Sequence, residues 1–160
     1  YRSRIETIKE VMPHACIGVD VIVGHPGETE DEFLKTYEFL NELPISYLHV
    51  FTYSERPNTT AVRVKDEVVH VQERRKRNKM LTILSEKKKR AFYEQFENSS
   101  RKALFERENK DGFMFGSTDN YLRVKLPFDN SLAGKIVEVE ISELQDNTVF
   151  KGRLISETIS

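Results

Sequence analysis

The chain has 160 residues, of which 38% are hydrophobic, and a formal net charge of -1. This length allows one ordinary domain or two small ones with a modest core. No apolar run approaches the ~20 residues that span a bilayer, and the first ten residues lack the apolar core of a secretory signal, so we expect a soluble, cytoplasmic protein with no membrane partner. The single cysteine, Cys16, excludes an internal disulfide and an all-cysteine metal site built from this chain alone, and it fits a reducing compartment.

Charge is distributed unevenly along the chain. Lys and Arg number 6 against 10 Asp and Glu in residues 1–64, 10 against 5 in residues 65–95, and 9 against 11 in residues 96–160. A polyanionic partner would therefore be attracted mainly to the middle segment. The chain opens at Tyr1 without a methionine, inside a helical pattern, so we expect a fragment of a longer protein.

The first part of the chain predicts a helix, a strand, a helix and a second strand. Residues 2–12 carry apolar side chains at helical spacing. The stretch CIGVDVIVG, residues 16–24, is apolar at nearly every position, which is typical of a strand covered on both faces in a parallel sheet. A helix over residues 30–43 and a strand at YLHVFTYS, residues 47–54, complete a strand, helix, strand unit with an expected right-handed crossover.

The corner after the first strand, GHPGE at residues 24–28, lies where α/β sheets bind ligands. Glycines let a backbone approach a ligand, and the next helix offers unpaired amides behind Thr29 and Glu32, which have capping-box spacing. A tight turn without a ligand would use the same residues, so both interpretations stay open. Asp20 lies inside the apolar strand, where an unpartnered carboxylate would be costly. We therefore expect a hydrogen-bond partner for it, structural or functional.

Residues 66–96 are highly charged, with recurring apolar side chains that predict one long helix or two joined ones. The runs RRKRNK, residues 74–79, and EKKKR, residues 86–90, lie on it. Such runs usually form a solvated helical face, and a face turned toward nucleic acid is the alternative. In the preceding loop, Arg56 and Thr59 could serve an anionic ligand or cap the loop.

Beyond Asn98 the hydrophobic period changes to two. Five short alternating runs, separated by turn residues, occupy residues 102–107, 113–118, 121–126, 135–141 and 148–155. They predict a small five-stranded antiparallel barrel, a class that often binds oligonucleotides. The fold class is therefore α/β followed by all-β, with FENSS marking the boundary between residues 1–96 and 97–160. The four histidines show no metal-ligand spacing, so we expect no metal site in this chain.

Two linked motifs carry a family resemblance. DVIVGHPGETEDEF, residues 20–33, followed by LHVFTYSERPNTTA, residues 48–61, resembles the later part of the radical S-adenosylmethionine domain of methylthiotransferases, and the final barrel resembles their TRAM domain. Through His49 the chain resembles most the branch that methylthiolates N6-threonylcarbamoyladenosine in tRNA, next to the anticodon. The chain departs from the pattern at His25, where phenylalanine is usual, and at Asn58, where glycine is common.

The resemblance implies a partial parallel (β/α) barrel that holds S-adenosylmethionine on a [4Fe-4S] cluster, with a second [4Fe-4S] cluster assisting radical insertion of a methylthio group at C2 of the base. The chain lacks the family's cluster cysteines, so we expect this fragment to bind no cofactor and to be inactive alone. A ribosomal-protein aspartate methylthiotransferase and a non-catalytic RNA-binding module are the alternatives. Truncation would leave a sheet edge unpaired, which makes an edge-strand dimer an option.

The resemblance also assigns residues to two candidate sites. The cofactor pocket would be lined by Asp20, Ile22, Gly24, Gly27, Glu28, Phe51 and Tyr53. The barrel would contact the anticodon stem-loop of tRNA through Arg101, Lys102, Arg123, Lys125, Lys151 and Arg153, with Phe115 and Tyr121 available for stacking. Because the barrel segment has slightly more acids than bases, its affinity would come from charge clustered on one face, and scattered surface lysines are the alternative.

Overall fold

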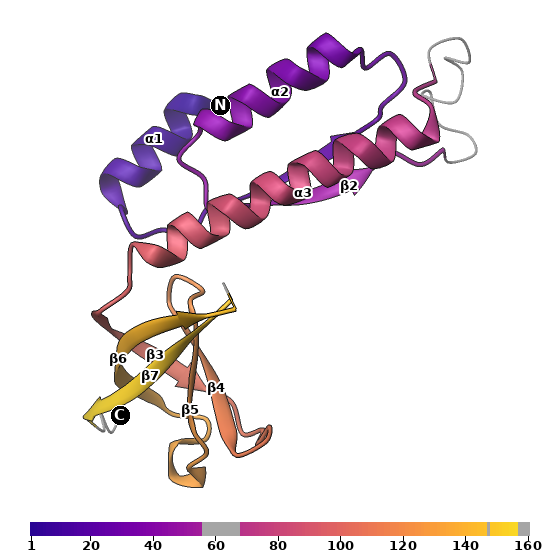
Figure 1. The fold of residues 1–160 in the computed structure, drawn as a ribbon. Coiled ribbons are helices and arrows are strands. Elements are labelled where there is room, and N and C mark those ends of the chain that lie inside the picture. The colour runs from indigo at the N-terminus through magenta and orange to yellow at the C-terminus, as the bar shows by residue number, and fades with distance from the viewer. Residues whose placement is uncertain (56–67, 147, 157–160) are drawn as a thin grey trace. The chain divides into compact units, whose positions relative to one another are not determined.

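The computed structural model describes residues 1–55, 68–146 and 148–156. They form two compact units, Tyr1–Lys89 and Arg90–Ser160 (Figure 1). The division falls inside the long helix α3, Val71–Glu94, whereas the boundary predicted from the sequence lies after residue 96. The predicted loop residues Arg56 and Thr59, together with Asn58, lie outside the described residues.

The first unit confirms the predicted order of helices and strands. Its two strands pair in parallel, with Gly18 opposite Tyr47 at one end and Val23 opposite Thr52 at the other. The charged middle segment forms one helix among the described residues rather than two joined ones. The elements are α1 (Arg2–Val11), β1 (Gly18–Val23), α2 (Glu30–Glu42), β2 (Tyr47–Thr52) and α3.

Only one face of the two-stranded sheet is covered by the described residues. On that face Val19, Val23 and Leu48 join a core that takes its other buried side chains from all three helices and from the α2–β2 connection. Side chains alternate across a strand, so Asp20 and Ile22 lie on the opposite, exposed face. The predictions of a strand covered on both faces and of a buried aspartate are therefore wrong for this chain, because every described helix packs on the same side.

Side chains of helix α3 also cover the outer edge of β2, and the two elements lie close together in Figure 1. The Leu48 N–H donates to Ser85 Oγ at 2.8 Å, and the Ser85 hydroxyl donates to the Leu48 carbonyl at 2.9 Å. Further along, Asn78 Nδ2 donates to Thr52 Oγ1 at 3.0 Å. A helix laid over a strand edge removes it as a template for pairing. These contacts close the β2 edge of the sheet; β1 is the other edge strand, and no observation on the described residues supports the predicted dimer through it.

The second unit is a closed barrel in the order β3-β4-β5-β7-β6. The five predicted strands are confirmed, but the prediction that all neighbours are antiparallel is wrong, because β5 and β7 run parallel. In a closed ring with an odd number of strands, directions cannot alternate all the way round, so at least one neighbouring pair must be parallel. The strands are β3 (Ser99–Phe105), β4 (Phe113–Thr118), β5 (Arg123–Pro127), β6 (Ile136–Gln145) and β7 (Val149–Ser156), with a 3-10 turn η3 (Asn130–Leu132) between β5 and β6.

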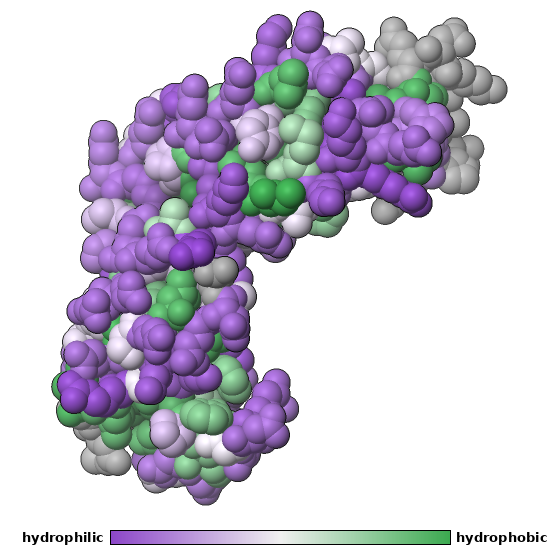
Figure 2. All heavy atoms as spheres, viewed as in Figure 1, coloured by the Kyte–Doolittle hydropathy of each residue, from purple (hydrophilic) through white to green (hydrophobic). Residues whose placement is uncertain are grey.

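The surface in view is mostly hydrophilic, with smaller hydrophobic patches between the polar side chains (Figure 2). Within the described ranges, no helix combines the length and the apolar character needed to cross a membrane.

The predicted capping box at the start of α2 is confirmed, and its contribution to the stability of the protein can be measured. The Glu32 N–H donates to Thr29 Oγ1 at 3.2 Å, and the Thr29 N–H donates to Glu32 Oε2 at 2.9 Å. Hydrogen bonds from the Thr29 backbone and hydroxyl hold the pKa of Glu32 below its ordinary value. We expect Thr29→Ala to lower the free energy of unfolding by about 1 kcal/mol, measured by urea denaturation followed by circular dichroism.

Thr36→Ala on the same helix is the matched control. The Thr36 hydroxyl donates to the Glu32 carbonyl inside the helix, and alanine has the higher helix propensity, so its stability should be unchanged or slightly raised. Equal losses in the two variants would show that the cap contributes nothing of its own.

Candidate cofactor rim and nucleic-acid surface

The exposed face of the β1–β2 sheet brings three of the predicted cofactor residues together. The parallel register sets Asp20 opposite His49 and Ile22 opposite Phe51. Ile22 is 60% exposed and Phe51 is 53% exposed. Neither a hydrogen bond nor an ion pair within the described ranges holds the Asp20 carboxylate, so the partner expected for it is not found there. A neighbouring apolar pair beside a carboxylate and an imidazole can receive a flat heterocycle and its polar edge.

The corner after β1 requires glycine for reasons internal to the protein. Gly24 and Gly27 have positive φ angles of 78° and 86°, a backbone conformation that favours glycine. A Cβ on Gly24 would lie 2.4 Å from Arg74 Cγ. The family resemblance predicts that a ligand passes close to Gly24, and the structure shows that the stem of Arg74 already packs on the side where a Cβ would project.

Glu28 faces this corner rather than the solvent, and its side chain is 18% exposed. Both of its carboxylate oxygens lie 3.2 Å from the Gly24 N–H, which donates to them. Arg77 Nη1 donates to Glu28 Oε1 at 2.5 Å and to the Glu28 carbonyl at 2.9 Å. Glu28 therefore holds the shape of the corner, with a guanidinium as its counter-charge.

Tyr53 closes the same corner from the end of β2. Its N–H donates to the Val23 carbonyl at 2.8 Å, and its ring meets the His25 ring edge-on at a centroid distance of 5.6 Å. The guanidinium of Arg74 lies 5.5 Å from the centre of the Tyr53 ring. The Tyr53 hydroxyl is buried and finds no hydrogen-bond partner among the described residues. A buried donor without a partner is costly, which makes this hydroxyl a candidate contact for a ligand at the corner.

Iron–sulfur clusters do not fit the part of the chain that the structure describes. No three His, Cys, Asp or Glu side chains gather there in a way that could hold a metal ion. The single cysteine, Cys16, is half-buried, and burial raises the pKa of its thiol. A thiol disfavoured as thiolate is a poor ligand, so Cys16 is poorly suited to bind iron.

The outer side of β4, β5 and β7 gathers five of the eight predicted RNA contacts into what we call the basic face. Outward side chains alternate with core side chains such as Met114 and Val124. Lys125 Nζ lies 5.0 Å from the ring centre of Phe113, a stacking candidate missed from the sequence, although its spacing of two from Phe115 signals a shared face. The basic face consists of Phe113, Phe115, Arg123, Lys125, Lys151 and Arg153.

Two of its four cations are already paired. Arg123 forms a two-pronged ion pair with Glu106, at 2.5 and 3.0 Å, which raises the pKa of Arg123 and lowers that of Glu106. Arg153 binds Glu140. Lys125 and Lys151 lie directly opposite each other in the parallel register, and neither has an acidic partner among the described residues. Like charges placed opposite each other destabilise a sheet, so this pair costs stability unless an anion covers it.

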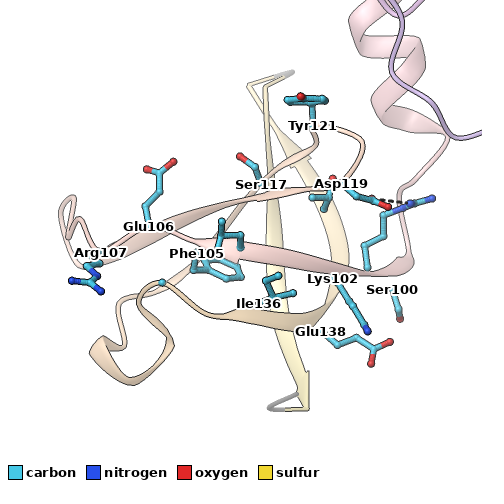
Figure 3. A pocket seen from close by; sticks show the side chains of 14 residues that line it. Ser100, Lys102, Phe105, Glu106, Arg107, Ser117, Asp119, Tyr121, Ile136 and Glu138 are labelled. Carbon is cyan, nitrogen blue, oxygen red and sulfur yellow. Dashed lines mark ion pairs between the residues drawn. The ribbon is translucent and has the colours of Figure 1, made fainter. Parts of the chain in front are cut away.

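The other three predicted RNA contacts line an open groove over β3, with a volume of about 1030 Å³ (Figure 3). Arg101 lies 3.5 Å from Asp119 at one end of the groove, with its guanidinium 4.5 Å from the ring centre of Phe96. Lys102 faces Glu138 across the β3–β6 pair. Tyr121 is 76% exposed, and Figure 3 shows its ring standing clear of the strands.

The β4–β5 connection holds Tyr121 outward in an unusual backbone conformation. Its φ is 63°, a left-handed angle uncommon for an aromatic residue. The Thr118 hydroxyl donates to Asn120 Oδ1 at 2.6 Å and accepts from the Leu122 N–H at 3.0 Å, and both polar side chains are buried. Strain of this kind persists only where the surroundings impose it, so the exposed ring is preset rather than mobile at its backbone.

Comparison with known proteins agrees with this division of the chain. Residues 94–154 match the TRAM domain. Over 145 residues the chain is 36% identical to the threonylcarbamoyladenosine tRNA methylthiotransferase MtaB of Bacillus subtilis, covering 88% of this chain and 32% of that protein. The chain is a homologue of the methylthiotransferases, and its barrel is a TRAM domain.

Other branches of the family match at similar levels. The tRNA-2-methylthio-N(6)-dimethylallyladenosine synthase of Symbiobacterium thermophilum is 33% identical over 100% of this chain and 34% of its own length. The ribosomal protein uS12 methylthiotransferase RimO of Alkaliphilus oremlandii is 32% identical over 98% of this chain and 37% of its own. The chain therefore spans about a third of the length of these relatives.

The Glu106–Arg123 pair gives a pH prediction. Because the pKa of Glu106 is lower in the folded state than its ordinary value of 4.5, its stabilisation is present above that value and is lost as the pH falls through the folded pKa. At neutral pH we expect Glu106→Gln to cost at most about 1 kcal/mol, since both side chains remain partly exposed to solvent. The difference from the wild type should vanish in acid.

The measurement is a carboxyl NMR titration of Glu106 together with urea denaturation at several pH values. In Arg123→Gln the titration midpoint of Glu106 should rise toward its ordinary value. An unchanged midpoint would show that the ion pair does not form in solution.

Proposed function

We propose that the parent protein is a tRNA-modifying methylthiotransferase that places a methylthio group at C2 of N6-threonylcarbamoyladenosine, next to the anticodon, by radical chemistry. The observation that carries this proposal is the similarity to MtaB along 88% of the chain, joined to a TRAM domain. The parallel strand, helix, strand unit is what one piece of a (β/α) barrel would contribute. The fragment alone would be inactive, and its cytoplasmic location stays a prediction.

S-adenosylmethionine fits the open face of the first unit. Ile22 and Phe51 offer exposed apolar surface to an adenine ring, and Asp20 lies on the same face for a polar edge. Gly24 and Tyr53 border this face at the corner, where the buried Tyr53 hydroxyl has no hydrogen-bond partner among the described residues. When bound, the cofactor supplies an adenosyl radical. The [4Fe-4S] clusters would be held by parts of the parent outside this chain.

The TRAM domain would bind tRNA through two surfaces. On the basic face, Lys125 and Lys151 would meet phosphates, which neutralises their mutual repulsion, and Phe113 and Phe115 lie beside the cations for base stacking. At the groove over β3, the preset ring of Tyr121 would stack on an unpaired base. Because cations are clustered on these surfaces, a domain with no excess of basic over acidic residues could still bind a polyanion.

Deletion of the parent gene tests the proposed activity directly. Mass spectrometry of tRNA nucleosides should show that the 2-methylthio form of threonylcarbamoyladenosine disappears while the unmodified form accumulates, because the step that adds the group is lost. Reintroducing the intact gene should restore the modified nucleoside, and reintroducing only this 160-residue chain should not.

Two other results would replace the proposal. Intact tRNA modification together with loss of a methylthio group from ribosomal protein uS12 would support the ribosomal branch, which is also similar to this chain. No change in either substrate would favour a non-catalytic RNA-binding protein.

Binding of tRNA to the chain tests the basic face. We expect affinity to fall with rising salt, and Lys125→Gln with Lys151→Gln to reduce the slope of log affinity against log salt by about 2, since each lost phosphate contact removes about 1. The same double variant should be slightly more stable than the wild type, because two opposed like charges are removed. Filter binding and thermal unfolding measure the two effects.

Lys35→Gln is the matched control, because this exposed lysine lies on α2 in the first unit and is not part of the basic face. It should leave the salt slope unchanged. If Lys125→Gln with Lys151→Gln behaves like this control, the lysines are scattered surface charges and RNA binds elsewhere.

A further inference from the structure

We infer that Arg77 and Arg74, two arginines from the charged run of α3, are positioning residues for the cofactor rim. The inference rests on the proposed function, since the rim is the Gly24–Glu28 corner and the Tyr53 segment beside it. Both side chains are buried, with Arg74 at 5% and Arg77 at 6% exposure. Arginines are almost never buried to this degree unless they are paired, so each must have a fixed set of partners.

Arg77 holds the corner that follows β1. Its Nη1 atom donates to both the carboxylate and the carbonyl of Glu28, and the carboxylate in turn accepts the Gly24 N–H. The guanidinium also lies 5.4 Å from the ring centre of Phe33 in the first turn of α2. One cation on α3 thereby sets the position of Glu28 and, through it, the backbone amide of Gly24.

Arg74 holds the segment that follows β2, one helical turn away. Its Nη1 donates to the Tyr53 carbonyl at 3.1 Å, its Nη2 to Glu55 Oε1 at 2.6 Å, and its Nε to the Val69 carbonyl at 2.7 Å. The hydrogen bond from Arg74 lowers the pKa of Glu55. Its stem packs against Gly24 at the same time, so Arg74 contacts both halves of the rim.

The predicted pocket therefore has two kinds of support. Asp20, Ile22 and Phe51 take their positions from strand register, which any parallel pair would impose. Glu28 and Tyr53 lie just beyond the ends of the strands, where Tyr53 keeps one backbone bond to Val23 and both residues are held by side chains from α3.

Amide hydrogen exchange on this chain tests the positioning role without cofactor. Arg77→Met should speed exchange at Gly24 and Glu28 about tenfold, as expected for loss of a charged hydrogen bond, while β3–β6 amides keep their protection. Arg77→Lys should recover much of it, because a single nitrogen makes both bonds to Glu28. Arg75→Met, an exposed neighbour on the same helix, should match the wild type.

The second arm measures binding of S-adenosylmethionine to the cluster-loaded parent protein by equilibrium dialysis. Arg77→Met should weaken binding about tenfold relative to Arg75→Met, with Arg77→Lys between them. The inference would be overturned if the Gly24 and Glu28 amides of Arg77→Met exchanged as slowly as those of the wild type. It would also be overturned if both proteins bound S-adenosylmethionine with equal affinity. A wild-type parent that binds no S-adenosylmethionine would instead overturn the proposed function.

Discussion

The buried ion pair between Arg77 and Glu28 is the contact on which the first unit's corner depends. Taking two charges out of water is costly unless each finds its full set of partners, and here the carboxylate also accepts a backbone N–H while the guanidinium also binds a carbonyl. The same side of α3 carries further anchors at a spacing of three or four residues. These are Arg74 on the β2 segment, Leu81 in the core, Ser85 on the β2 edge and Lys88 on the end of α2.

A topological constraint plays the corresponding part in the TRAM domain. Five strands closed into a ring must include a parallel pair, and in this barrel the pair is β5 and β7. That pairing sets Lys125 directly opposite Lys151 and continues the outer surface of β4, with its two phenylalanines, onto β7. The basic face is thus a product of ring closure, since its residues come from strands that are not all consecutive in the chain.

Local signals predicted much of the fold and part of the site. The capping box of Thr29 and Glu32, the two parallel strands and the five barrel strands follow from spacing and alternation, which depend on neighbours along the chain. The predicted burial of Asp20 was wrong, because an apolar strand does not reveal how many of its faces are covered. The interpretation of the run RRKRNK as a solvated face is confirmed only in part, since Arg75, Lys76 and Lys79 are exposed while Arg74 and Arg77 are buried.

The sequence by itself determined the order and approximate position of the described helices and strands and which residues of β1 and β2 share a face, because side-chain period is a local property. It also carried the family resemblance that the TRAM match and the methylthiotransferase homologues support. Only the tertiary structure decided which charges of α3 turn inward and which lysines meet across β5 and β7. Those outcomes depend on partners far away in the chain, Glu28 for Arg77 and Lys151 for Lys125, whose proximity no local pattern encodes.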